Sequence, residues 1–106
     1  DYAMQPWKTL AATTGVGVLS EGWNLAESPE PGVARVYTLE VPFAEPFFNP
    51  PVVQAGLTGF DMDHAFSGRL SLKVITITPS GFSVSISTWE DSKVYAVEFS
   101  WLAIGA

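Results

Sequence analysis

Trp89, Glu90 and Asp91 carry the clearest chemical signal in this sequence. An indole ring offers a flat apolar face, and the two carboxylates beside it accept hydrogen bonds. A sugar uses both kinds of group, because the C–H face of its ring packs on aromatic side chains while its hydroxyls need fixed polar partners. We expect Tyr95 to reach the rim of the same surface. The alternative is structural, with Trp89 packed under a neighbouring loop or subunit.

Few residues are suited to catalysis. The chain has one histidine and no cysteine, which excludes disulfides, thiolate catalysis and Cys-type zinc sites. Asp61, Asp63 and His64 are close in sequence and could serve a hydrolase or hold a metal ion through carboxylate oxygens. However, the further acidic positions of an EF-hand loop are missing. A solvated acidic loop is the simpler interpretation, so we expect neither enzymatic activity nor a cofactor.

The charge balance argues against polyanionic partners. Eleven acidic residues against five basic ones give a formal net charge of −6 at pH 7. The basic residues are scattered along the chain and do not cluster: Lys8, Arg35, Arg69, Lys73 and Lys93. Nucleic acids and anionic membranes attract a basic patch, so we expect neither as a partner. With only 15% charged residues and 47% hydrophobic ones, part of the surface is expected to be covered by another subunit.

Short alternating runs of apolar and polar residues dominate the chain, as is typical of strands with one buried face. We predict strands over 16–19, 35–41, 52–57 and 69–78, with two more in the last quarter. Residues 59–64 are predicted to form a loop. No segment has convincing helical periodicity and no linker divides the chain. Residues 1–106 are therefore predicted to form one all-β domain, an antiparallel β-sandwich or small barrel. No apolar run is long enough for a transmembrane helix, and a signal peptide or tag could have been removed before Asp1.

The two strands of the last quarter are predicted to pair as a hairpin. Their apolar positions form a core stripe: Phe82, Val84, Ile86, Tyr95, Val97, Phe99 and Trp101. Trp89 is in phase with the serines between them, on the polar face. A turn over Glu90–Lys93 pairs Thr88 with Tyr95 and puts Trp89 and Tyr95 on opposite faces, whereas a turn one residue longer puts them on the same face. The phase of the serines favours the shorter turn.

The segment before the third predicted strand is rich in proline. Four prolines between residues 42 and 51 exclude an interior strand. We predict an extended crossover in which Phe43, and either Phe47 or Phe48, close the core. In the fourth strand, Leu70, Leu72 and Val74 face the core. The opposite face is polar and could border a groove between subunits.

Several short motifs, in order, resemble the H-type lectin domain family over about residues 14–104. They are Pro42-Phe43-x-x-Pro46, Pro50-Pro51-Val52-Val53, Phe60-Asp61, Pro79-Ser80-Gly81-Phe82, Thr88-Trp89, Val94-Tyr95 and Ser100-Trp101-Leu102. The resemblance implies a six-stranded antiparallel β-sandwich with an immunoglobulin-like two-sheet architecture. It also implies a secreted or surface-associated homotrimer that binds glycans ending in galactose or N-acetylgalactosamine, without catalysis, in clefts between subunits.

By position, the resemblance assigns Arg69 to one side of each cleft, with Gly32 in a loop whose backbone contacts the sugar. It assigns Trp89, Glu90 and Tyr95 to the wall contributed by the adjacent subunit. Two features depart from the family. Ala34 stands where the family has a sugar-binding aspartate, and Glu30 is a possible replacement. The cysteines that join two trimers in the family are absent. A trimeric assembly module that keeps the fold without a sugar site is therefore the alternative.

Overall fold

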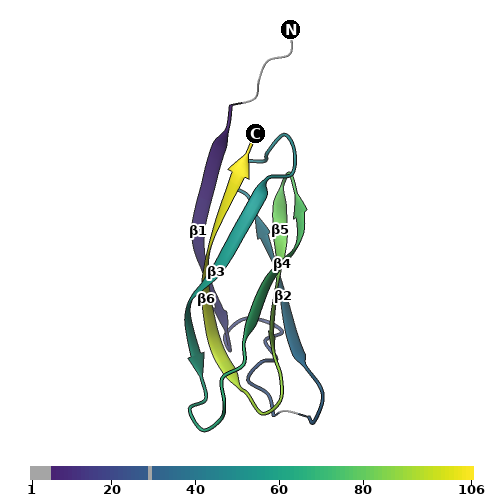
Figure 1. Cartoon of the computed structure of the whole chain (residues 1–106), viewed down its shortest axis with the longest axis vertical. Coiled ribbons are helices and arrows are strands. Elements are labelled where there is room, and N and C mark those ends of the chain that lie inside the picture. Colours follow the sequence, from purple (N-terminus) through teal and green to yellow (C-terminus); the bar gives the residue numbers. More distant parts are fainter. Residues whose placement is uncertain (1–5, 29) are drawn as a thin grey trace.

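The computed structural model describes residues 6–28 and 30–106, which form six strands. The strands are β1 (Lys8–Gly17), β2 (Arg35–Pro42), β3 (Val52–Met62), β4 (Ser71–Thr78), β5 (Gly81–Thr88) and β6 (Val94–Gly105). They make two antiparallel sheets, with the strand orders β1-β6-β3 and β2-β5-β4. The two sheets pack face to face as a sandwich, and their strands run along the long axis of the molecule (Figure 1). The predicted all-β, six-stranded fold class is confirmed. Among the described residues, none forms a helix that could span a membrane.

The two central strands, β5 and β6, supply most of the core. Val84, Ile86 and Phe99 are fully buried between the sheets. Trp101 is also buried, as predicted, and its ring meets that of Phe82 edge-on at a centroid distance of 5.2 Å. Alternation places the serines of β5 on the outer face of its sheet. Period two in the sequence therefore identified the buried face of both strands.

The predicted hairpin of the last quarter is wrong. β5 pairs with β2 and β4, whereas β6 pairs with β1 and β3. Thr88 lies opposite Arg35, not Tyr95, so neither predicted register exists. Residues 89–93 are a link between sheets, because the two apolar faces must be brought together across the sandwich. Each strand was correctly predicted to have a buried face, but alternation alone does not say which strand is its neighbour.

Tyr95 also leaves the predicted core stripe. Val94 and Val97 are both buried although they are three residues apart, so the alternation is interrupted between them. The register of β3 against β6 shifts at the same point, between Asp61 and Met62. Such a bulge turns one residue away from its expected face. Tyr95 is consequently only half-buried and is free to make polar contacts.

Three other boundaries differ from those predicted. β1 covers Lys8–Gly17, not 16–19, because this mostly exposed edge strand lacks alternation but pairs with β6 along its whole length. β3 runs on through residues 59–62, predicted as a loop, with a register shift between Leu57 and Gly59. The fourth strand begins at Ser71, not at Arg69.

In the crossover between β2 and β3, Phe43 and Phe47 are buried, with Phe47 4% exposed, whereas Phe48 is 72% exposed.

Three connections meet at one end of the sandwich, the lower end in Figure 1. They are β1–β2, β3–β4 and β5–β6, and their described residues are 18–28, 30–34, 63–70 and 89–93. We call these residues the loop end. The other two connections and the C-terminus lie at the opposite end (Figure 1). Because consecutive strands are antiparallel, every second connection returns to the loop end.

Candidate functional site

All five predicted site residues lie at the loop end or directly beside it. Gly32 belongs to the first connection and Arg69 to the second. Trp89 and Glu90 begin the link between the sheets, and Tyr95 follows that link as the second residue of β6. These positions are far apart in sequence, and the sandwich brings them to one end of the molecule.

Arg69 is fixed against the link of its own chain. Its Nη1 donates to Asp91 Oδ1 at 2.7 Å and to Ser92 Oγ at 3.1 Å. The Arg69 carbonyl accepts the hydroxyl of Thr88, and the Ser92 hydroxyl donates to the carbonyl of Ser67. The Arg69–Asp91 ion pair remains partly exposed, so it adds little stability. Its main effect is to orient the Arg69 and Asp91 side chains. The result is a donor and an acceptor held side by side at the surface.

Trp89 and Glu90 follow β5 at the surface. The Trp89 side chain is 38% exposed, in line with its predicted place on a polar surface. Glu90 has a φ of +55°, the only positive value among the described non-glycine residues. This left-handed conformation is unfavourable for a residue with a Cβ and needs support from its surroundings.

Arg35 is a functional candidate that the sequence analysis did not identify. It is 7% exposed, and its two terminal nitrogens donate to four backbone carbonyls. Nη1 reaches Leu25 and Glu27 at 3.1 and 3.0 Å, while Nη2 reaches Glu90 and Ser92 at 3.2 and 2.6 Å. The sequence offered only one weak signal, an arginine in phase with Tyr37 and Leu39 on the buried face of a strand.

Tyr95 contacts the second connection. Its hydroxyl donates to Asp63 Oδ2 at 2.8 Å, and the backbone N–H of Ala65 donates to Asp63 Oδ1 at 2.8 Å. These two bonds, the Ala65 bond first, lower the pKa of Asp63, because they favour the ionised carboxylate. The same carboxylate raises the pKa of Tyr95, because it holds the phenol proton. Asp63 thus closes a turn and anchors Tyr95.

This use of Asp63 bears on the hydrolase and metal alternatives. Its two carboxylate oxygens are already engaged by Ala65 and Tyr95. Within residues 6–28 and 30–106, no three His, Cys, Asp or Glu side chains are grouped to hold a metal ion. The arrangement around Asp63 is that of a turn closed by its own carboxylate and joined to Tyr95.

Gly32 is exposed in the first connection and has a φ of +75°. Its neighbours Glu30 and Pro31 line a hollow of about 170 Å³ together with Glu90 and Asp91. This hollow joins the Gly32 loop to the link of the same chain. Three of its four lining residues are acidic, so it presents hydrogen-bond acceptors.

A wider groove is lined by Tyr95 and by residues of β1, β3 and β6. Its volume is about 550 Å³, and its lining includes Leu19, Phe60, Asp61 and Glu98. Leu19 is 99% exposed, although it is fully apolar. Tyr95 therefore faces a different hollow from Glu90, and among the described residues no hydrogen bond joins Arg69 to Trp89, Tyr95 or Gly32. The five residues share one end of a chain but do not converge in a single pocket.

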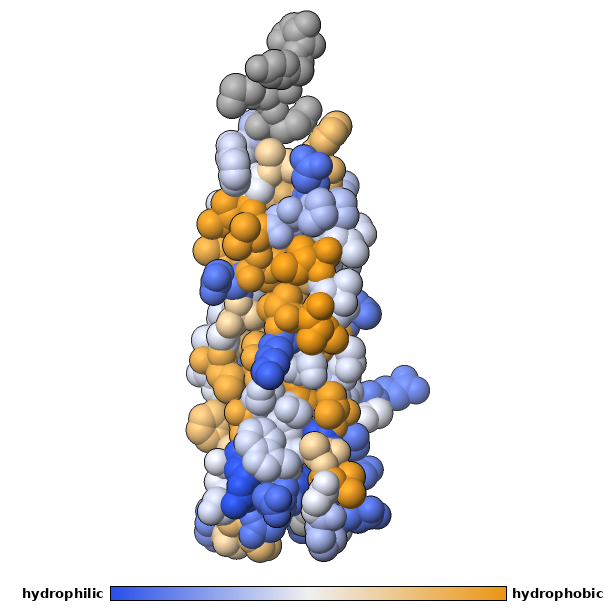
Figure 2. All heavy atoms as spheres, turned by 45° about the vertical axis from the view of Figure 1, so that its right-hand side comes forward, coloured by the Kyte–Doolittle hydropathy of each residue, from blue (hydrophilic) through white to orange (hydrophobic). Residues whose placement is uncertain are grey.

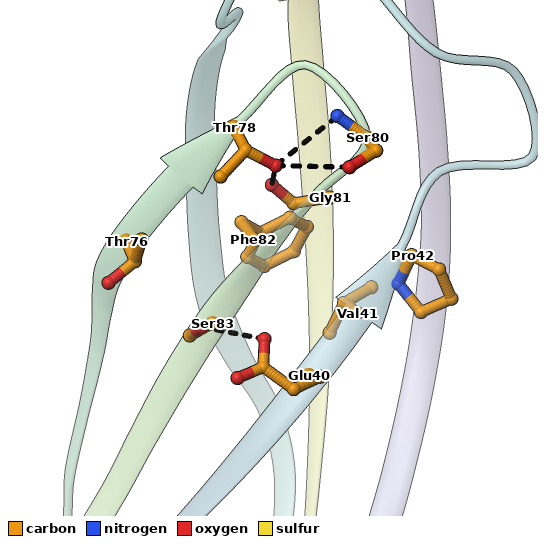
Figure 3. A pocket seen from close by; sticks show the side chains of 9 residues that line it. All are labelled: Glu40, Val41, Pro42, Thr76, Thr78, Ser80, Gly81, Phe82 and Ser83. Atoms are coloured by element: carbon orange, nitrogen blue, oxygen red, sulfur yellow. Dashed lines mark hydrogen bonds between the residues drawn. The ribbon is translucent and has the colours of Figure 1, made fainter.

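A further hollow of about 440 Å³ lies on the outer face of β2, β5 and β4, towards the end opposite the loop end. Figure 3 shows Ser83 on β5, which donates to Glu40 on β2, and Thr76 and Thr78 on β4; the Ser83–Glu40 distance is 2.7 Å. None of the predicted site residues lines it. It has hydroxyl groups but no exposed aromatic ring on which a sugar could stack.

Comparison with known proteins identifies the family. The family model described as H-type lectin domain matches residues 38–104, more than half of the chain. This chain belongs to the H-type lectin domain family. The match includes Arg69, Trp89, Glu90 and Tyr95, whereas Gly32 lies before it. The predicted resemblance is confirmed.

Two solved structures of discoidin II from Dictyostelium discoideum share the fold of this H-type lectin domain. The wild-type protein superposes with a TM-score of 0.74 at 22% identity, covering 92% of this chain and 37% of its own. The recombinant native protein gives a TM-score of 0.73 at 23% identity, with coverages of 91% and 36%. At this identity the likeness concerns the fold. The chain corresponds to little more than a third of each discoidin.

A protein of Fuscovulum blasticum, described as "ATP synthase subunits region ORF 7", is more similar in sequence. It is 43% identical over 72 residues, which are 68% of this chain and 63% of that protein. The H-type lectin domain thus spans less than two thirds of this relative's length.

Proposed function

We propose that this H-type lectin domain is a non-catalytic carbohydrate-binding module for glycans ending in galactose or N-acetylgalactosamine. The observation that carries the proposal is the coincidence of family and geometry. The family match spans Arg69, Trp89, Glu90 and Tyr95, and the sandwich gathers these residues at one end. A partly exposed indole ring then lies in the same link as Asp91, which is paired with Arg69 of the second connection.

The chemistry suits a neutral sugar. The face of Trp89 can pack against the C–H face of a pyranose ring. The Arg69 guanidinium donates hydrogen bonds, and Asp91 and Glu90 accept them from sugar hydroxyls. Ala34 stands where the family has an aspartate, and the acceptors on Glu30, Glu90 and Asp91 could compensate for its loss. No cofactor or metal ion is needed for such binding.

We further propose that the sugar binds between subunits of a homotrimer. The resemblance assigns Arg69 to one subunit and Trp89, Glu90 and Tyr95 to its neighbour, so two chains would complete each site. Large apolar side chains are also exposed on the strands, among them Val52, Phe60 and Ile75. Figure 2 shows hydrophobic surface over much of one flank, with hydrophilic surface gathered towards the loop end. Such surface is typical of contact with a partner.

A trimer would also raise the affinity. A single shallow sugar site typically binds with a dissociation constant of about 0.1 to 1 mM, roughly −4 to −5.5 kcal/mol. Three sites on one side of an assembly can engage several glycans of the same surface, which increases avidity by orders of magnitude. We therefore expect strong binding only to glycans presented at high density.

Charge restricts the partners of the loop end. It carries six of the eleven acidic residues, against the basic residues Arg69 and Lys93. Arg69 is already paired with Asp91. Nucleic acids and anionic membranes are therefore not proposed as partners, and no membrane insertion is proposed. A secreted or surface-associated location would give a single domain of residues 1–106 access to glycans.

A glycan array tests the proposal. The wild-type protein is expected to bind galactose- or N-acetylgalactosamine-terminated glycans at high density. Trp89→Ala is expected to lose about five- to tenfold in apparent affinity, because the stacking contact is worth on the order of 1 kcal/mol. Trp7→Ala is the matched control, since Trp7 is exposed but lies near the opposite end. Absence of binding by the wild type, or equal binding by Trp89→Ala, contradicts the proposal.

The second candidate is a trimeric assembly module without a sugar site. Two observations favour it: Ala34 replaces the family's aspartate, and Arg69 is engaged by Asp91 of its own chain. A trimer that responds to no glycan on the array would support it.

A further inference from the structure

The link between β5 and β6 has little secondary structure to support it. It leaves one sheet at Thr88 and enters the other at Val94, and it carries Trp89, Glu90 and Asp91. Three backbone bonds are present: Ser92 N–H to the Trp89 carbonyl at 3.3 Å, Asp63 N–H to the Lys93 carbonyl at 3.0 Å, and Val94 N–H to the Leu25 carbonyl at 2.8 Å. Buried backbone groups require partners, and the carbonyls of Glu90 and Ser92 find theirs on a side chain.

That side chain is the guanidinium of Arg35. One planar group holds two connections, because Nη1 binds carbonyls of the first and Nη2 binds carbonyls of the link. A buried charge is costly unless it is compensated. Here the compensation is four carbonyl dipoles, and no carboxylate contacts the group among the described hydrogen bonds and ion pairs. All four carbonyls belong to the loop end, so the Arg35 guanidinium binds the backbone of the loop end.

The hydrogen bond from Arg35 to the Glu90 carbonyl helps to set the backbone direction of the link. Glu90 is the residue with left-handed backbone, and Arg35 Nη2 binds its carbonyl at 3.2 Å. The next carbonyl but one, on Ser92, is bound by the same nitrogen at 2.6 Å. The Glu90–Asp91 and Ser92–Lys93 peptide units, which flank the Asp91–Ser92 pair, are thereby fixed. The orientation of the Trp89 ring relative to the Asp91 carboxylate follows from this backbone.

We propose that Arg35 is a positioning residue for glycan binding. It does not touch the sugar; it holds the link so that Trp89 and Asp91 present their stacking face and acceptor together. This inference rests on the proposed function of the same surface.

The main test compares Arg35→Lys with Val41→Ala. Lysine keeps the charge but has one nitrogen, which cannot bridge two connections in a planar arrangement. Val41 is 8% exposed on the same strand, β2, at its far end, and serves as a control for lost stability alone. Glycan dissociation constants are measured well below the melting temperatures of both variants. Arg35→Lys is expected to bind about tenfold or more weakly, as loss of one or two buried polar contacts predicts, while Val41→Ala is expected to match the wild type.

Amide hydrogen exchange gives a readout independent of any sugar. The Ser92 and Val94 amides should exchange faster in Arg35→Lys than in Val41→Ala, while the amides of central β5 change equally in both. If the wild type binds no glycan, the proposed function fails, whereas faster exchange at Ser92 and Val94 still upholds the role of Arg35 in holding the link. Glycan binding that is equal in Arg35→Lys and the wild type overturns the inference.

Should Arg35→Lys not fold, the wild-type protein carries the test. If the Arg35 bonds favour binding, then binding must favour those bonds, because the coupling is reciprocal. Saturation with the glycan is therefore expected to slow proton exchange at the Arg35 guanidinium. Unchanged exchange on saturation would show that the two are not coupled and would overturn the inference.

Discussion

At the scale of single residues, the site depends on polar pairs that the sequence does not place next to each other. Asp63 and Tyr95 are thirty-two positions apart and share a hydrogen bond. Arg69 and Asp91 are twenty-two apart and form an ion pair. Each pair joins the second connection to the link or to the strand that follows it. A single contact at this end therefore fixes two segments at once.

The Asp63–Tyr95 pair should respond to pH in a defined window. Asp63 has a lowered pKa, so its contribution to stability is present above the ordinary carboxyl value of about 3.9 and is lost as the pH falls through the lowered value. Tyr95 has a raised pKa, so its contribution is present below the ordinary phenol value of about 10 and is lost as the pH rises through the raised value.

We therefore expect Tyr95→Phe to move the Asp63 pKa part of the way back up, because the larger cause, the Ala65 N–H bond, remains. A carboxyl NMR titration measures this change. The difference in unfolding free energy between wild type and variant should be greatest between about pH 4 and pH 10 and smaller on either side. An unchanged Asp63 pKa in Tyr95→Phe would contradict the assigned contact.

For single residues, the sequence predicted exposure correctly where the alternating pattern indicated it. Trp89 was predicted on a polar surface because it is in phase with the serines that precede it, and the residue is partly exposed. Sequence reasoning failed for Arg35, because the partners of that side chain are backbone carbonyls. Every residue has a carbonyl, so no pattern of side chains marks where a guanidinium will find four of them.

At the scale of elements, alternation predicted the buried faces correctly except at Tyr95, and it predicted the neighbouring strands incorrectly. The apolar faces of β5 and β6 were identified from period two, yet the strands belong to different sheets. A short polar link fits a hairpin and a crossing between sheets equally well. The crossing is favoured here because each strand becomes the centre of its own sheet, with both edges paired. The additional pairing is made with β1, β2, β3 and β4, so it cannot be inferred from the sequences of β5 and β6 alone.

The crossover between β2 and β3 gives an element-scale test with two adjacent phenylalanines. Phe47 is buried and Phe48 is exposed. We expect Phe47→Ala to lower the unfolding free energy by about 3 kcal/mol, because it removes a buried aromatic ring and leaves a cavity. Phe48→Ala is expected to change it by less than about 0.5 kcal/mol. Urea unfolding of the two variants measures both values, and equal losses would contradict the described packing.

At the scale of the whole molecule, the question is how copies of the chain meet. The proposed trimer requires Arg69 of one subunit to face Trp89 of the next. The chain has no cysteine, so single cysteines can be introduced without interference. We expect a refolded mixture of Arg69→Cys and Trp89→Cys chains to form covalent dimers with a short bifunctional maleimide, detected on denaturing gels. Each variant treated alone is the control.

Sedimentation of the uncross-linked protein accompanies that experiment. A trimeric mass with covalent dimers only in the mixture would support clefts between subunits. A trimeric mass without covalent dimers in the mixture would mean that Arg69 and Trp89 of neighbouring chains are apart. A monomeric mass would contradict the proposed assembly itself.

The separation of the loop end from the C-terminus also has a practical consequence. Ala106 accepts hydrogen bonds from the backbone N–H groups of Phe48 and Asn49 at the far end of the sandwich. A tag or bead attached after Ala106 would point the loop end outward, in a uniform orientation. Amine coupling would instead also use Lys93, which lies in the link itself. The choice of attachment chemistry can therefore decide whether a sensor chip records a sugar at all.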